Sequence, residues 1–315
     1  LTFLTPALLA GDKSQVNVVA HELAHAWTGN LVTNANAEHF WLNEGFTVFA
    51  ENRILEQLEG VEVAALHAAV GHQDLLDAFK QFEKHPELTK LRTRLEGVDP
   101  DEAFSSVPYQ KGYLFLKTLE AAAGRARFDA LLKKWLQSHR FGAVTTDDFT
   151  RLVEELEPGL LAEVGATAWL DEPGLPERHW RPESKKLEAV RGQLGRVPSN
   201  TEAWTPAEWQ LWLDATPRPF AACAEVDARF HLTDAKNPEV LVSWLTLAAE
   251  SRYEPVLPRI EEVLGRYGRM KYLKPLYRAL AARPETKGRA KALFEKLRSR
   301  YHPIAQQVLA GVVRD

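Results

Sequence analysis

A His-Glu-Leu-Ala-His pentapeptide at residues 21–25 constrains this chain more than any other feature. Histidines four residues apart lie on one face of an α-helix, so the imidazoles of His21 and His25 can reach one metal ion. Glu22 lies on the adjacent face, where it can contact a water beside the metal. The helical pattern runs over residues 12–29. Its mostly apolar flanks predict a buried helix, in which titratable groups would require a functional reason.

A catalytic zinc usually has three protein ligands and one open position. Eighteen residues separate His25 from Glu44, which stands in the segment Trp-Leu-Asn-Glu-Gly. We expect Glu44 near the start of the next helix, at about 43–58, as the third ligand of one Zn²⁺ per chain. Glu22 is then the general base for the attacking water. Glu51 lies two helical turns after Glu44, so we expect it to accept the second ring N–H of a ligand histidine.

The remaining pattern is mainly α. Helical stretches are predicted at 62–84, 108–123, 127–138 and 146–156, and the only strand signals are residues 1–5 and 32–33. Prolines and glycines interrupt the pattern at 157–186, which places a proline-rich linker at 171–186 between domains 1–170 and 187–315. Beyond it, prolines precede most helical stretches and Thr205 and Asn237 precede two of them as caps. Short helices joined by short turns predict an α-solenoid of the HEAT or armadillo type.

Composition excludes several classes of protein. Of 315 residues, 45% are apolar and 26% charged, which is ordinary for a globular chain and excludes a disordered or fibrous one. The single cysteine, Cys223, excludes a disulfide scaffold, and the apolar runs are too short to span a membrane. The net charge of −4 argues against a nucleic-acid partner, although residues 251–315 hold 15 basic and six acidic residues. We expect a cytoplasmic protein that binds neither nucleic acid nor membrane.

Two segments carry a family resemblance. His-Glu-Leu-Ala-His-Ala-Trp-Thr-Gly-Asn-Leu-Val-Thr at 21–33 and His-Phe-Trp-Leu-Asn-Glu-Gly-Phe-Thr-Val at 39–48 resemble the M1 family of zinc aminopeptidases. The segments 99–112, 169–176 and 268–272 resemble its leukotriene A4 hydrolase-like branch. The resemblance implies the helical part of a thermolysin-like (gluzincin) catalytic domain before the solenoid. It also implies removal of N-terminal residues from short peptides.

The resemblance assigns further roles residue by residue. Tyr109 corresponds to the tyrosine that stabilises the oxyanion. Arg269 and Lys271 correspond to the pair that holds the free C-terminal carboxylate of a short peptide. Asp101 matches an acid used by the branch in epoxide chemistry, whereas Phe104 stands where leukotriene-processing members carry a tyrosine.

Departures from the family pattern leave alternatives open. Family members anchor the substrate amine with a Gly-x-Met-Glu-Asn motif, which this sequence lacks; its only methionine is Met270. In full-length relatives the motif precedes the region matched here, so we expect the N-terminal part of the same protein as a partner. Phe104 and Ala37 alter two pocket positions, so peptide hydrolysis ranks above epoxide hydrolysis. Two other hypotheses for its function are a weakly catalytic, peptide-binding fragment and an endopeptidase.

Overall fold

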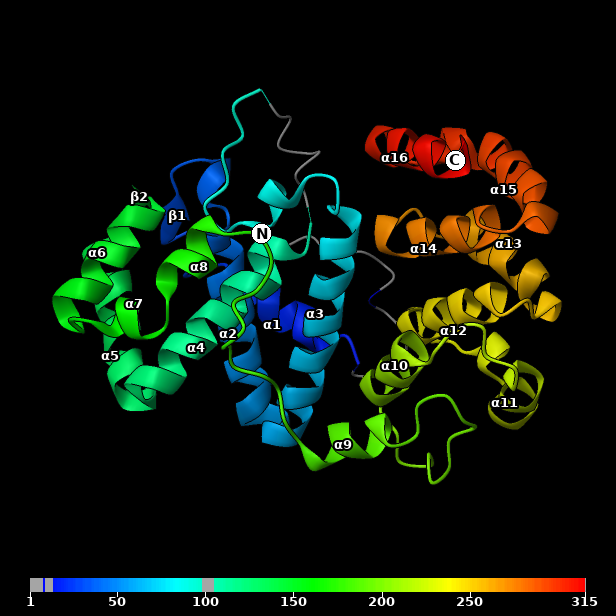
Figure 1. The fold of residues 1–315 in the computed structure, drawn as a ribbon, viewed down its shortest axis with the longest axis horizontal. Helices are drawn as coiled ribbons and strands as arrows, with labels where there is room; N and C mark the ends of the chain where they lie inside the picture. Colours follow the sequence, from blue (N-terminus) through cyan, green and yellow to red (C-terminus); the bar gives the residue numbers. More distant parts are fainter. Residues whose placement is uncertain (1–7, 9–13, 98–104, 315) are drawn as a thin grey trace. The chain divides into compact units, whose positions relative to one another are not determined.

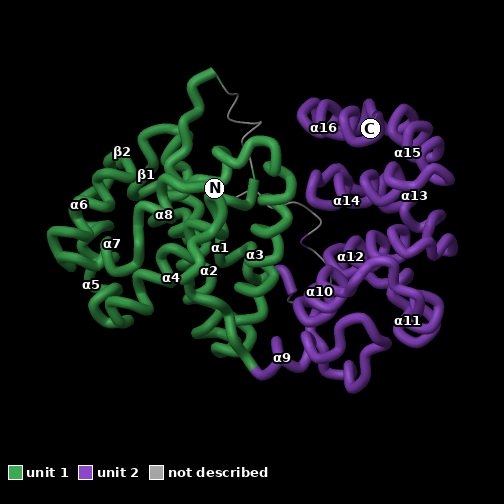
Figure 2. Tube along the Cα trace, in the orientation of Figure 1, with its two compact units in different colours: residues 1–3, 16–184 green, residues 4–15, 185–315 purple. Residues whose placement is uncertain are grey.

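The fold is mainly helical, as the sequence predicts, and is seen in a computed structural model that describes residue 8 and residues 14–97 and 105–314 (Figure 1). The chain forms two compact units, with residues 16–184 in unit 1 and residues 185–315 in unit 2 (Figure 2). Among the described helices, none has the length and apolar character that crossing a bilayer requires.

Unit 1 is built around the long helix α2, Trp41–Glu59. It packs against α1 (Val16–Ala24), α3 (Val61–Gln81), the five-residue π-helix Val107–Lys111 and α4 (Gly112–Ala123). Trp41, Phe46 and Phe49 of α2 are buried with Phe115 of α4 in one aromatic core. The remaining helices of the unit are α5 (Arg125–Ser138), α6 (Thr146–Leu156), α7 (Leu160–Glu163) and α8 (Ala166–Asp171).

A small parallel sheet joins distant parts of unit 1. Strand β1, Val32–Asn34, pairs with β2, Gly142–Val144, with Val32 opposite Gly142. The sequence indicates the first strand only weakly and gives no signal for the second. The 3₁₀ turn Ala37–His39 follows β1 and precedes α2, so the pairing holds the connection between α1 and α2 in place.

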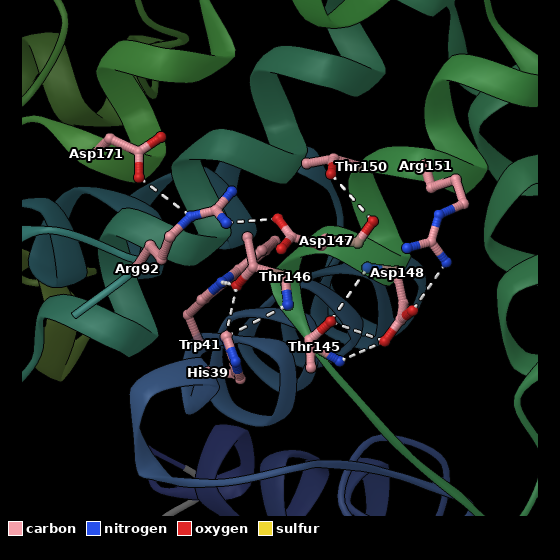
Figure 3. Close-up of polar contacts among 10 residues, drawn as sticks. All are labelled: His39, Trp41, Arg92, Thr145, Thr146, Asp147, Asp148, Thr150, Arg151 and Asp171. Atoms are coloured by element: carbon pink, nitrogen blue, oxygen red, sulfur yellow. Dashed lines mark hydrogen bonds and ion pairs between the residues drawn. The ribbon is translucent and has the colours of Figure 1, made fainter. Parts of the chain in front are cut away.

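The start of α2 is tied to the start of α6 by a buried threonine (Figure 3). Thr146 is fully buried, and its Oγ1 accepts a hydrogen bond of 3.0 Å from the indole Nε1 of Trp41. The same Oγ1 lies 3.0 Å from Nδ1 of His39. Thr145 caps α6 by accepting from the backbone N–H of Asp148, whose carboxylate accepts from the backbone N–H of Thr145 in return.

Unit 2 is a layered arrangement of short helices, consistent with the predicted solenoid-like domain. Helix α12 (Pro238–Glu250) packs against α10 (Pro206–Ala215) and α14 (Met270–Ala281), and α14 packs against α16 (Pro303–Arg314). Thr205 and Asn237 cap α10 and α12 with their side-chain oxygens, so both predicted caps are present. The helices are α9 (Lys185–Arg191), α10 (Pro206–Ala215), α11 (Cys223–Phe230), α12 (Pro238–Glu250), α13 (Leu257–Arg266), α14 (Met270–Ala281), α15 (Pro284–Leu297) and α16 (Pro303–Arg314).

Two expectations about the first helix are wrong. The helix ends at Ala24 rather than near Gly29, because the backbone tightens into turns in which Ala26 N–H and Trp27 N–H bond three residues back. Its apolar flanks are also not buried all round: Leu23 is 61% and Trp27 50% exposed. Apolar composition alone therefore does not justify the burial that we inferred from it.

Candidate metal centre

The two histidines of the pentapeptide and Glu44 converge at one point. Nε2 of His21 and Nε2 of His25 lie 3.3 and 3.5 Å from the same oxygen, Oε2 of Glu44. One ligand atom from each residue falls within 4.8 Å of the others. His21 is in α1 and Glu44 is in the first turn of α2, while His25 follows the end of α1. The backbone N–H of His25 still bonds to the carbonyl of His21, which preserves the helical i to i+4 geometry.

Hydrogen bonds at the far side of each ring indicate which nitrogen faces the centre. Nδ1 of His25 lies 2.8 Å from the carbonyl oxygen of Thr28, which can only accept, so Nδ1 carries the proton. Nδ1 of His21 lies 3.1 Å from Oε2 of Glu51. Both neutral rings then direct an Nε2 lone pair toward the centre.

This arrangement fits a cation. Oε2 of Glu44 is buried and makes no hydrogen bond of normal geometry among the described residues. Two lone pairs and a carboxylate oxygen that face one another repel unless a positive charge lies between them. Two imidazoles and one carboxylate are also the ligand set of many catalytic zinc sites.

Glu51 lies beside His21. Its second oxygen accepts a 3.1 Å hydrogen bond from Nδ2 of Asn17, so the carboxylate is fixed from two sides. Burial lowers the pKa of His21, but the hydrogen bonds and charges of Glu44 and Glu51 outweigh it and raise the pKa to about 9. The two carboxylates therefore favour positive charge at this centre, whether a ring proton or a bound cation supplies it.

Tyr109 lies over the same centre. Its ring is stacked on that of His21 with centroids 6.0 Å apart, and Phe40 meets it edge-on, also at 6.0 Å. Burial, the charge of Glu44 and a hydrogen bond to Glu44 raise the pKa of the Tyr109 phenol well above 10.0, and the charge of Glu22 adds to this. Glu22 itself is partly buried on α1, next to His21.

A close backbone contact sets the distance between Tyr109 and α2. A Cβ added to Gly45 would lie 2.8 Å from the Cα of Gly112, which directly follows the π-helix that carries Tyr109. Only a residue without a side chain fits there. Gly45 is adjacent to Glu44, so this contact brings the tyrosine turn against the helix that supplies the carboxylate.

Arg269 and Lys271 share one partner within unit 2. Nη1 of Arg269 lies 3.1 Å from Oε1 of Glu239, and Nζ of Lys271 lies 3.0 Å from Oε2. Tyr272 donates a 2.7 Å hydrogen bond to the same carboxylate. The Arg269 and Lys271 side chains are 34% and 40% exposed, whereas Glu239 is buried. Burial raises the pKa of Glu239, but Lys271 and Arg269 outweigh it and hold the pKa below its ordinary value.

Some site residues were missed and two cannot be placed. Asp101 and Phe104 lie outside the described residues. Sequence reasoning overlooked Glu239, and it overlooked Thr47, whose Oγ1 lies 3.2 Å from Nδ1 of His25. Thr47 is one turn beyond Asn43 on the face of α2 that meets α1, a signal that helical spacing could have supplied.

Fold and site together define a mainly helical chain with a candidate metal site of the His-Glu-x-x-His type. The peptidase family M1 domain matches residues 1–169, more than half of the chain, and the chain belongs to that family. The C-terminal domain of leukotriene A4 hydrolase matches residues 204–313.

Individual relatives agree with this assignment. Leucine aminopeptidase 2 of Sclerotinia sclerotiorum is 36% identical over 97% of this chain and 53% of its own length. The leukotriene A-4 hydrolase homolog of Botryotinia fuckeliana is 36% identical over 97% of this chain and 50% of its own length. The structure of yeast LTA4 hydrolase in complex with bestatin aligns with a TM-score of 0.88 and 28% identity, covering 99% of this chain and 56% of the yeast chain. The chain thus spans about half the length of the relatives it matches.

Proposed function

We propose that this chain carries the zinc site of an aminopeptidase that removes N-terminal residues from short peptides. The observation that carries the proposal is the convergence of two Nε2 atoms and one carboxylate oxygen, a donor set that a divalent cation would satisfy. Membership of family M1 supports the reaction class.

His21, His25 and Glu44 are the residues that would hold the metal. A zinc ion bound by this set supplies a Lewis acid that works at neutral pH without redox chemistry. Glu51 and the carbonyl of Thr28 would hold the two imidazoles in the required tautomer through their Nδ1–H groups.

The remaining chemistry belongs to Glu22 and Tyr109. Glu22 follows His21 directly, so its carboxylate can take the proton of the attacking water and pass it to the leaving amine. The phenol of Tyr109, stacked against His21, can donate a hydrogen bond to the carbonyl oxygen as negative charge develops on it.

The test compares Glu22→Gln with Glu59→Gln, an exposed glutamate at the end of α2. Metal content is measured by elemental analysis, and turnover is measured on peptides with free and with acetylated N-termini. We expect stoichiometric zinc in both variants and a loss of turnover of at least about a hundredfold in Glu22→Gln alone. The unmodified protein should cut only the free peptides. Normal turnover in Glu22→Gln refutes the base, and cleavage of acetylated peptides identifies an endopeptidase instead.

We further propose that Arg269 and Lys271 bind the free C-terminal carboxylate of the substrate. Both side chains remain partly exposed although they contact Glu239, and arginine suits a bidentate carboxylate pair. Arg269→Ala should raise KM for tripeptides more than KM for amide-capped aminoacyl reporters. Arg266→Ala, which changes an exposed arginine of the same unit, is the control. Equal losses on both substrates would contradict carboxylate binding.

A further inference from the structure

Lys111 is a fully buried lysine with no evident part in the chemistry above. Its side chain is 0% exposed, and Nζ donates hydrogen bonds of 2.9 Å to the carbonyl of Thr89 and 2.8 Å to the carbonyl of Glu172. Burying an amine against neutral acceptors is costly for its charged form. Burial accordingly lowers the pKa of Lys111 to about 7. A neutral amine has two N–H donors, which the two carbonyls satisfy.

The two carbonyls belong to segments far apart in the sequence. Thr89 ends the short 3₁₀ turn Pro86–Thr89, and Glu172 follows α8. Oγ1 of Thr89 in turn accepts a 2.9 Å hydrogen bond from the backbone N–H of Gly174. The amine of Lys111 therefore sits at the junction of three segments and fixes the C-terminal end of its own turn to them.

That turn is the π-helix that carries Tyr109. π-helices are rare, cost more than α-helical turns and occur mostly at functional sites. Ser106 holds the other end, because its Oγ donates a 2.9 Å hydrogen bond to the carbonyl of Asp74 in α3. A π-helical turn contains one residue more than an α-helical turn. If this turn became regular α-helix, the side chains before it would rotate by about 100° around the helix axis relative to those after it. Tyr109 would then no longer face the metal centre.

We propose that Lys111 is a positioning residue for Tyr109, holding the π-helix in the register that directs the phenol at the metal centre. The inference rests on the proposed function, in which Tyr109 is the oxyanion donor. Lys111 acts through the backbone, two residues from Tyr109, and does not touch the substrate.

The experiment is a double-mutant cycle of Lys111→Met and Tyr109→Phe in the zinc-loaded protein. We expect Tyr109→Phe to lower kcat by about a hundredfold, as removal of an oxyanion donor does, with little change in KM. Lys111→Met should lower kcat by about tenfold or more, also with little change in KM, because the phenol is misplaced. In the Tyr109→Phe background, Lys111→Met should cost less than about twofold, because there is no phenol left to position.

Lys117→Met is the matched control. Lys117 lies on α4, its side chain is 16% exposed, and it pairs with Glu120 rather than with the carbonyls around the π-helix. It should leave kcat unchanged, and all variants should retain zinc. If Lys111→Met does not fold, Lys111→Gln, which keeps N–H donors on a shorter side chain, takes its place in the same cycle.

The outcomes separate the two ideas. An unchanged kcat in Tyr109→Phe removes the oxyanion role, and with it both the proposed mechanism and this inference. A normal effect of Tyr109→Phe combined with full activity in Lys111→Met refutes the positioning role alone. Multiplicative losses in the double variant also refute it, because they would mean that Lys111 acts independently of the phenol.

Discussion

Replacing Thr146 with valine should destabilise unit 1, because the buried indole N–H of Trp41 loses its hydrogen-bond acceptor. Thr146 and Trp41 are both fully buried, and the 3.0 Å bond from Nε1 of Trp41 to Oγ1 of Thr146 is the indole's hydrogen bond in the structure (Figure 3). Valine keeps the shape of threonine but offers no acceptor. A buried donor without a partner costs about 1–3 kcal/mol. His39 also loses its contact with the hydroxyl, but its Nδ1 still accepts a 3.4 Å hydrogen bond from the backbone N–H of residue 146, so the cost at His39 is smaller.

Urea denaturation followed by far-ultraviolet circular dichroism measures the effect. Thr146→Ser keeps the hydroxyl and loses only a methyl group, so it should cost about 1 kcal/mol or less. Trp41→Phe removes the donor but also leaves a cavity, so it is costly by itself. The double variant Trp41→Phe with Thr146→Val should lose less stability than the sum of the two single losses, by about 1 kcal/mol or more. Equal costs for valine and serine, together with additive costs in the cycle, would refute the reasoning.

Three further predictions follow from other contacts. Burial lowers the pKa of Lys111 to about 7 in the folded protein, from 10.5 for an ordinary lysine. Between these two pH values the amine is protonated in the unfolded chain but mostly neutral in the folded one, so the free energy of unfolding should rise with pH across this window. The gain is on the order of 3 kcal/mol between about pH 7 and 9.5 and should be absent in Lys111→Met when both are unfolded in urea. Gly45→Ala should lower both the melting temperature and kcat, because the new Cβ meets backbone at 2.8 Å. Gly288→Ala is the control, at an exposed position of α15 with open space around it, and it should instead stabilise the protein by about 0.5–1 kcal/mol. Glu51→Gln should weaken zinc binding by about 10- to 100-fold in chelator competition, because it removes the carboxylate from His21; an unchanged affinity would show that this contact is dispensable.

The parts of the site that local spacing determines could be predicted from the sequence. His21 and His25 need only helical periodicity, and Glu51 needs only two turns of α2 counted from Glu44. The proximity of Glu44 to the two histidines could also be predicted, because a short connection between two helices brings the end of one close to the start of the next. The caps at Thr205 and Asn237 depend on neighbouring residues and were likewise predictable.

What the sequence did not reveal depends on partners far along the chain. The amine of Lys111 contacts residues 22 and 61 positions away, and Glu239 meets Arg269 from 30 positions away. The strand at Gly142–Val144 exists only because β1 pairs with it. The prediction that the first helix is buried on all sides failed at Leu23 and Trp27, which are exposed. Apolar side chains favour burial, but their sequence does not tell which other part of the chain packs on them.

The carboxylate of Glu239 has a consequence for ligand charge. Taken together, the charged side chains of Arg269, Lys271 and Glu239 carry a net charge of +1. A ligand end with one negative charge would bring this cluster to neutrality, whereas a second negative charge would meet no counterion among these three residues and would face Glu239 itself. Peptides ending in aspartate or glutamate should therefore gain nothing at this position over those ending in a neutral residue.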